Sequence, residues 1–106
     1  MTKEEQIKII SSLNEKTMDI MKSKGADYAD EDVLSNFKQV SSVIKTLCID
    51  ITIPEGYAML MIILKLSRIN NIKKDNKDPK NESLLDSYED MINYCKLAYL
   101  CEYENN

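Results

Sequence analysis

Acidic residues gather on one side of the helix that the sequence predicts near residues 82–101. Glu82, Asp86 and Asp90 follow one another at intervals of four residues, so they lie on one face of such a helix. Mg²⁺ prefers oxygen ligands, and two carboxylates one turn apart can share an ion. The spacing therefore predicts a magnesium site. The alternative interpretation is a solvated face whose first acids complement the positive end of the helix dipole.

Two cations stand within an otherwise apolar segment, the helix predicted over residues 54–72. Lys65 and Arg68 are three residues apart, which places both on one side of that helix. One interpretation is that they extend to the surface or pair with the acids of the last helix. The other is that they bind phosphate groups beside the acidic face, because Arg offers a bidentate fork and Lys a point charge.

Acids, an amide and aromatic rings are combined between residues 26 and 37. Asp27 and Tyr28 come before the second predicted helix, and Asn36 and Phe37 lie near its start. A base stacked on Tyr28 would make this stretch part of a nucleotide site. The competing interpretation is that Tyr28 and Phe37 close the end of the helical bundle with their rings.

These candidate residues need a scaffold, and the sequence predicts an all-α four-helix bundle without a sheet. Only two Gly and two Pro interrupt the 106 residues, and apolar residues recur at helical spacing. The length suits one domain over residues 1–106. The predicted helices cover residues 3–24, 33–47, 54–72 and 82–101.

Local signals mark the ends of these helices. Thr2 with Glu5, and Thr52 with Glu55, have the spacing of capping boxes. We expect the tail from Glu102 onward to fray. The remaining signals are Gly25 as the stop of the first helix, Asp32 as the cap of the second and Asn81 as the cap of the fourth.

The last two predicted helices carry more apolar surface than the core of one chain can bury. The third helix is apolar almost all round from Met59 to Leu66, so we expect it to be central and buried on most faces. Tyr94, Leu97 and Leu100 add apolar surface beyond the stripe of the fourth helix. One chain cannot bury this surplus, which predicts a homo-oligomer, either a dimer or a dimer of dimers. The core-facing stripe expected on the fourth helix is Leu84, Tyr88, Met91, Cys95 and Tyr99.

Composition excludes several classes of protein. The net charge of −4 argues against direct binding along a nucleic-acid backbone, which needs a basic surface. The absence of His removes the usual zinc ligand and general base. We interpret Cys48, Cys95 and Cys101, which form no CxxC pair, as reduced and mostly packed thiols. A charged N-terminus and the lack of a long apolar run predict a cytoplasmic protein with no membrane span.

Three segments of this chain resemble a known family. They are KGADYADEDVLSNF at 24–37, IPEGYAMLMIILKLSRI at 53–69 and ESLLDSYEDMINYCKLA at 82–98. Together they resemble phage and prophage proteins of the nucleotide-modification-associated domain 1, and a neighbouring family of uncharacterised phage proteins. Those families look like distant relatives of the MazG-type all-α NTP pyrophosphohydrolases. The best-defined motif residues are Asp27-Tyr28, Lys65 with Arg68, Asp86-Ser87, Asp90 and Tyr94.

The resemblance implies a nucleotide site and, in its catalytic form, cleavage of a nucleoside triphosphate between the α and β phosphates. Mg²⁺ would be held by Asp86 and Asp90, with Glu82 or Asp27 assisting, and Lys65 and Arg68 would neutralise phosphate charge. Relatives of the MazG type build such sites beside subunit interfaces. The implied substrate-binding residues are Lys65, Arg68, Asp27, Tyr28, Asn36 and Tyr94.

This chain also departs from the family patterns. Ala29 stands where Gly commonly follows the Asp-Tyr pair, and the paired-acid motifs of MazG enzymes are not reproduced. A second hypothesis is therefore a non-catalytic phage counter-defence protein that sequesters a signalling nucleotide or inhibits a host immune protein. A third is a plain oligomeric helical module without a ligand.

Overall fold

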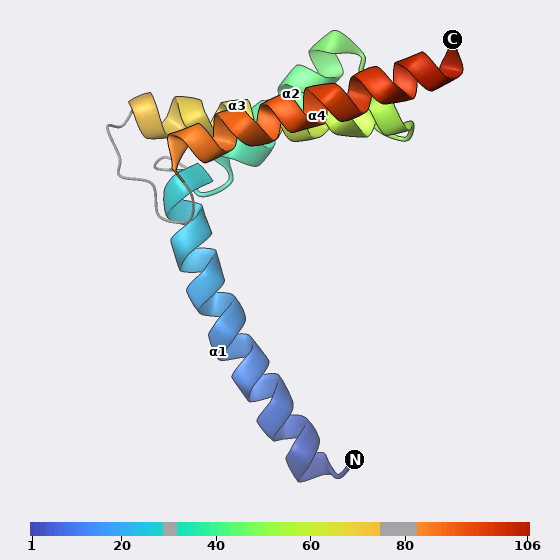
Figure 1. Cartoon of the computed structure of the whole chain (residues 1–106). Helices are drawn as coiled ribbons and strands as arrows, with labels where there is room; N and C mark the ends of the chain where they lie inside the picture. Colours follow the sequence, from blue (N-terminus) through green and yellow to red (C-terminus); the bar gives the residue numbers. More distant parts are fainter. Residues whose placement is uncertain (29–31, 75–82) are drawn as a thin grey trace.

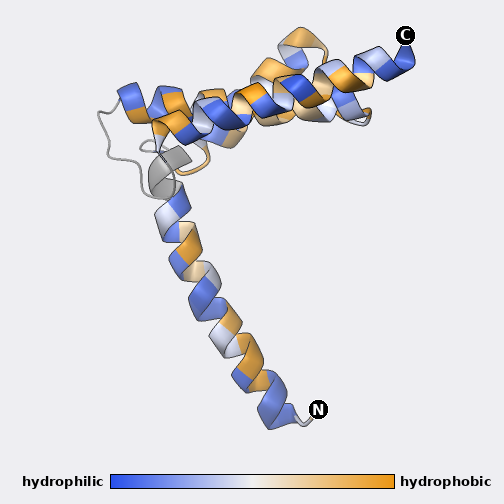
Figure 2. Cartoon of the chain, viewed as in Figure 1, coloured by the Kyte–Doolittle hydropathy of each residue, from blue (hydrophilic) through white to orange (hydrophobic). Residues whose placement is uncertain are grey.

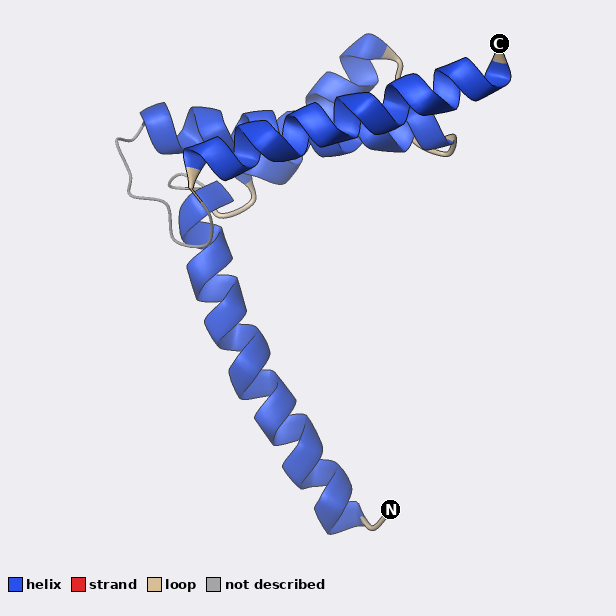
Figure 3. Ribbon diagram, viewed as in Figure 1, coloured by secondary structure: helices blue, strands red, loops and turns tan. Residues whose placement is uncertain are grey.

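The computed structural model describes residues 1–28, 32–74 and 83–106, apart from the side chains of 25–28. These residues form four helices and no strand: α1 (Lys3–Tyr28), α2 (Ser35–Leu47), α3 (Pro54–Lys74) and α4 (Leu84–Asn105). The all-α four-helix prediction is confirmed (Figure 3). No described helix is both long and apolar enough to cross a membrane.

The chain has two limbs that meet at one end (Figure 1). Helices α2, α3 and α4 pack together as the body, and α1 extends away from them as an arm. Helix α3 is central, as expected, because it contacts α1, α2 and α4, with α4 as its most extensive neighbour. The radius of gyration of 17.4 Å exceeds the value of about 13 Å for a globular domain of this length, because the arm projects.

The arm begins as predicted and ends later than predicted. The Thr2 amide donates to the Glu5 carboxylate at 2.9 Å, and the Glu5 amide donates to Thr2 Oγ1 at 3.1 Å, which completes the first capping box. The expected stop at Gly25 is wrong, since α1 continues to Tyr28. Gly within a helix costs about 1 kcal/mol relative to Ala, which does not oblige the helix to end there.

Helix α2 begins after an Asp turn and ends at a left-handed residue. Asp32 does not cap it directly: Leu34 is the N-cap without a side-chain bond, and its amide donates to Asp32 Oδ1 at 3.0 Å. A hydrogen bond from Lys38, followed by the Leu34 amide, lowers the pKa of Asp32. Cys48 follows the helix with φ 54° and ψ 43°, a conformation that favours Gly.

Helix α3 starts from an Asp turn in place of the predicted Thr52–Glu55 capping box. Both the amide and the hydroxyl of Thr52 donate to Asp50 Oδ1, at 2.9 and 2.5 Å, and these bonds lower the pKa of Asp50. The turn also packs against Gly56, where an added Cβ would lie 1.7 Å from the Asp50 carbonyl oxygen. The close approach of backbone to helix therefore requires glycine here.

Helix α4 is capped by Ser83, and the expected cap Asn81 lies outside the described residues. The Asp86 amide donates to Ser83 Oγ, and the Ser83 amide donates to Asp86 Oδ2, both at 3.1 Å. The predicted fraying from Glu102 is wrong, since the helix continues to Asn105. A second capping box thus exists in the fold, but at a different helix from the one the sequence indicated.

The predicted core-facing stripe of α4 is wrong in most of its members. Tyr88, Cys95 and Tyr99 are exposed, because α3 packs against a neighbouring face that is richer in small residues. Those residues recur at alternating intervals of three and four, the spacing of closely packed helix pairs. Apart from Asp90, the buried or half-buried residues of α4 are Leu84, Ser87, Met91, Tyr94, Ala98 and Cys101.

Few apolar residues of the body are fully buried. Only Val40, Ala58, Ile69 and Ile72 are buried apolar residues among those described. The expectation that α3 is buried on most faces is met only in part, since residues 60–65 are half-buried, and Met59 and Leu66 are exposed. The expected packing of the cysteines is also wrong for Cys48 and Cys95, which are exposed free thiols, whereas Cys101 is half-buried.

Candidate functional site

A buried arginine joins α3 to α4. Arg68 and Ser87 are both fully buried, and Arg68 Nη1 donates to Ser87 Oγ at 2.5 Å. The small side chain of Ser87 leaves room for the guanidinium between the helices. Because Arg keeps its charge in proteins, its burial must be offset by hydrogen bonds and by nearby negative groups. The sequence placed Arg68 at this interface but did not single out Ser87 as its acceptor.

An ion pair lies beside this contact. Lys65, one turn before Arg68 on α3, reaches Asp90 of α4 with an Nζ to Oδ2 distance of 3.2 Å. The side chain of Lys65 is 13% exposed and that of Asp90 is 41% exposed, so the pair sits at the edge of the interface. The interpretation that these cations pair with the acids of the last helix is confirmed for Lys65. The same contact leaves Asp90 engaged with a cation.

Asp86 has a structural task at the start of α4. Its Oδ2 accepts the Ser83 amide, which satisfies one of the free amide groups at the helix N-terminus. Asp86 and Asp90 lie one turn apart, and the remaining predicted ligand, Glu82, lies outside the described residues. Within the described part of the chain, no group of three or more His, Cys, Asp or Glu residues is placed to hold a metal ion.

Two carboxylates can hold a Mg²⁺ ion when phosphate oxygens and water supply its other ligands. In nucleotide-dependent proteins, Mg²⁺ is commonly held by one or two carboxylates together with substrate phosphates and water. Asp86 and Asp90 supply that number, and each also has a partner within the protein. The donor set therefore suits an ion that enters with a phosphate ligand better than an ion held by the protein alone.

The remaining predicted binding residues differ in where they lie and in how far the structure describes them. Asn36 is buried in the first turn of α2, and Tyr94 is half-buried on the face of α4 that meets α3. Phe37, expected to close the end of the bundle, is exposed. The side chains of Asp27 and Tyr28 lie outside the described residues, so their predicted roles stay predictions.

A polar layer crosses the body where the predicted site lies. It consists of buried Asn36, Ser67, Arg68, Asn71 and Ser87, drawn from three helices. Ser67 donates to Gln39 Oε1 of α2 at 2.6 Å, while its neighbour Arg68 bonds to α4. Two adjacent residues of α3 therefore form hydrogen bonds to two different helices, Ser67 to α2 and Arg68 to α4. Burying polar groups costs roughly 1–3 kcal/mol each where hydrogen bonds do not compensate, which makes this layer unusual in so small a core.

Two of the five residues of this polar layer were not predicted from the sequence. Ser67 and Asn71 were not selected, although the segment SRINN interrupts an apolar helix with four polar residues at 67–71. That interruption was the available signal. Lys73 was also missed: its Nζ lies 3.2 Å from the Tyr88 hydroxyl and 5.7 Å from the centre of the Tyr88 ring, which ties the end of α3 to α4.

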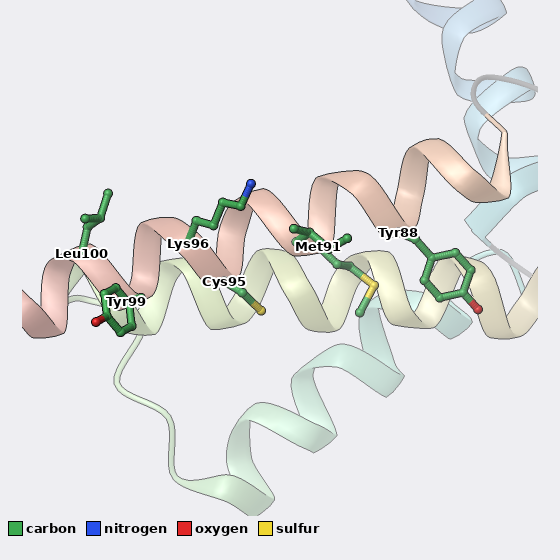
Figure 4. A pocket seen from close by; sticks show the side chains of 7 residues that line it. Tyr88, Met91, Cys95, Lys96, Tyr99 and Leu100 are labelled. Atoms are coloured by element: carbon green, nitrogen blue, oxygen red, sulfur yellow. The ribbon is translucent and has the colours of Figure 1, made fainter.

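The hollows of the described surface lie elsewhere. An open groove of about 780 Å³ follows α4 (Figure 4), and a smaller hollow of about 300 Å³ lies between α2 and α3 and includes Gln39 and Ser67. Neither is lined by Lys65, Arg68, Asp86 or Asp90. Lys65 and Arg68 instead contact α4 directly, whereas Asp86 is exposed. The α4 groove is lined by Tyr88, Met91, Ile92, Cys95, Lys96, Tyr99 and Leu100.

The fold and these contacts define a small all-α protein with a polar, charge-paired interface between its last two helices. Residues 58–101 match the family model described as nucleotide modification associated domain 1. The resemblance stated from the sequence is thus confirmed over this segment, which contains Lys65, Arg68, Asp86, Asp90 and Tyr94. Among curated proteins and solved structures, no significant match to the chain is found.

Proposed function

We propose that this protein binds a nucleotide, or a signal derived from one, at the α3–α4 interface. The observation that carries the proposal is the placement of Lys65 and Arg68 one turn apart on α3, facing the acids of α4, inside the segment that matches a nucleotide-associated family. Lys65 offers a point charge to phosphate oxygens, and Arg68, which is fully buried and bonded to Ser87, adds positive charge at the same interface.

In this proposal the Lys65–Asp90 pair opens on binding. A phosphate group takes the place of the Asp90 carboxylate at Lys65, which releases that carboxylate from the ion pair. When bound, Mg²⁺ supplies charge neutralisation and polarises a phosphate oxygen. Arg68 stays anchored by Ser87 and holds α3 and α4 at a fixed spacing. Asp86 and Asp90 are the residues that would hold the Mg²⁺ ion, through their carboxylate groups.

The catalytic form of the proposal is a MazG-like pyrophosphohydrolase encoded by a phage or prophage. The competing form is a counter-defence protein that binds a signalling nucleotide and does not cleave it. The second form is favoured by the partners that Asp86 and Asp90 already have, since neither carboxylate is held ready as a base for water. Both forms share the same binding contacts, and turnover separates them.

Thermal-shift measurements with nucleoside triphosphates and cyclic dinucleotides, each with and without Mg²⁺, test the proposal. A ligand that binds only the native state raises the melting temperature. Release of pyrophosphate, measured on the same samples, indicates the enzyme, and a shift without release indicates sequestration. If none of these probes shifts the melting temperature, the nucleotide proposal is wrong and the inhibition of a host protein becomes the better hypothesis.

Two variants place the ligand at this interface. Lys65→Gln should weaken the affinity for the responding nucleotide about tenfold, equivalent to about 1.4 kcal/mol, whereas Lys74→Gln, at an exposed position of the same helix, should not. Asp90→Asn distinguishes the roles of the carboxylate: it should tighten Mg²⁺-free binding by releasing Lys65, and weaken Mg²⁺-dependent binding by removing a ligand. Equal affinities for wild type and Lys65→Gln would contradict the assigned location.

A further inference from the structure

The arm exposes an apolar face that no other described part of the chain covers. Apart from its C-terminal end beside the body, α1 projects freely (Figure 1), and hydrophobic residues recur along it (Figure 2). Ile7, Leu13 and Met21 are 65%, 49% and 68% exposed. At 100° per residue, the apolar residues between Ile7 and Met21 occupy one half of the helix, and the charged residues of that segment occupy the other half. We call this the arm face: Ile7, Ile9, Ile10, Leu13, Met18, Ile20 and Met21.

Helix α4 carries a second exposed apolar face. Figure 4 shows Tyr88, Met91, Cys95 and Tyr99 pointing to one side of α4, where they line the open groove. This face lies beside the one that packs on α3, so it is free in the single chain. We call it the outer face: Leu85, Tyr88, Ile92, Cys95, Tyr99 and Tyr103, all of which are exposed.

The two faces have similar lengths. The arm face runs from Ile7 to Met21, which corresponds to about 21 Å of helix at 1.5 Å per residue. From Leu85 to Tyr103 the outer face runs about 27 Å. Both faces are continuous stripes. The arm face of one α1 can therefore lie along the outer face of an α4 over its whole length.

The accessible surface of the chain is larger than that of a compact monomer of the same mass. Its accessible surface is 8095 Å², whereas a folded monomer of 12.2 kDa is expected to expose about 6,100 Å². The excess of about 2,000 Å² per chain is larger than the roughly 800 Å² that each partner buries in a standard interface. Soluble monomers rarely expose contiguous apolar patches of more than a few hundred Å².

We propose that two copies of this chain exchange arms, so that the arm face of each packs on the outer face of α4 of the other. The exchange covers both apolar faces of both chains and adds a fourth helix alongside each three-helix body. Pairing of α4 with α4 would leave the arms bare and would bring together two helices that each carry five acidic residues and one lysine. Helix α1, with five acidic and five basic residues, is the better-matched neighbour for α4.

The test is the mass of the full chain in solution, measured by light scattering or sedimentation at micromolar concentration. The wild-type chain should have about twice the mass of 12.2 kDa. Leu13→Asp in the arm face and Ile92→Asp in the outer face should each give the monomer mass. Both residues are about half exposed in the single chain, so neither charge disturbs the fold of a monomer, and unchanged helicity by circular dichroism checks this.

Two control variants add the same charge outside these faces. Ser12→Asp lies on the charged side of α1, and Asn93→Asp lies on an exposed polar side of α4; both should remain dimeric. A wild-type monomer overturns the proposal. So does a dimeric Leu13→Asp with a monomeric Ile92→Asp, which would show pairing through α4 alone. The reverse pattern would show pairing of arms with each other and overturns it equally. None of these masses depends on nucleotide binding, so the two proposals fail independently.

Discussion

The α3–α4 interface and the arm invert the usual distribution of residues. The polar layer at this interface and its junction with α2 buries one arginine, two serines and two asparagines. The arm, in contrast, exposes isoleucines, a leucine and methionines to solvent. Burying polar groups without full compensation, and exposing apolar ones, both cost free energy. The two regions therefore differ in what stabilises them. The interface is stabilised by paired polar and charged groups, whereas the apolar face of the arm requires a surface outside the single chain.

The strongest test of this contrast is the removal of the buried arginine. Arg68→Ala should lower the free energy of unfolding by about 3 kcal/mol, because it leaves a cavity between α3 and α4 and removes the donor to Ser87. Lys22→Ala, on the exposed arm, should change it by less than about 0.5 kcal/mol. Urea denaturation followed by circular dichroism measures both.

A conservative variant keeps this test informative if Arg68→Ala does not fold. Arg68→Lys retains the charge and loses the planar donors, so the expected loss is smaller, about 1–2 kcal/mol. A loss below about 0.5 kcal/mol for both variants would mean that the buried arginine does not hold the interface together, and the contrast between the two regions would break.

A smaller effect of opposite sign is expected where α2 ends. Cys48 is exposed and adopts a left-handed conformation, which costs a non-glycine residue about 1 kcal/mol or more. Cys48→Gly should therefore stabilise the body by about 1 kcal/mol, seen as a higher melting temperature. The matched control is Cys95→Gly within α4, which should destabilise by a similar amount because glycine weakens a helix interior. Stabilisation by both substitutions would refute the backbone explanation.

The smallest effect concerns acid. The pKa of Asp50 is lowered in the folded chain by the Thr52 hydroxyl and amide, so the stabilisation from this turn is present above the ordinary Asp pKa of 3.8 and is lost as the pH falls through the lowered value. Asp50→Asn should therefore reduce the drop in melting temperature between pH 5 and pH 2.5. Thr52→Val, which removes only the hydroxyl donor, should act in the same direction more weakly. An unchanged pH profile in Asp50→Asn would contradict this origin.

The sequence indicated the helices well and their contacts less well. Thr2 and Glu5 formed the predicted cap because a capping box is a local interaction that needs nothing from the rest of the fold. The face of α4 was misassigned because Tyr88 and Tyr99 look like core residues when the apolar period alone is followed. The choice of face depends on close packing against α3, where Ser87 and Ala98 allow the helices to approach, and no local signal encodes that choice.

The candidate site was predicted in part for the same reason. Lys65 and Asp90 meet as expected because both lie on helices whose positions follow from periodicity. Ser67 and Asn71 were missed, and Ser87 was not recognised as the acceptor of Arg68, because a small polar residue is indistinguishable from a surface residue until its neighbours are known. Asp86 was predicted as a metal ligand or as part of a solvated acidic face, although its place three residues after Ser83 is also the spacing of a cap. The ligand roles of these residues stay predictions.

The outer face of α4 also gives the protein an optical property. The chain has no tryptophan and six tyrosines, so its near-ultraviolet emission comes from tyrosine alone. Three of the six, Tyr88, Tyr99 and Tyr103, stand on that face, and the rings of Tyr99 and Tyr103 are stacked with centroids 6.3 Å apart. A helix that packs along α4 changes the polarity around half of the tyrosines. The intrinsic fluorescence of the unlabelled protein therefore changes when this surface is covered.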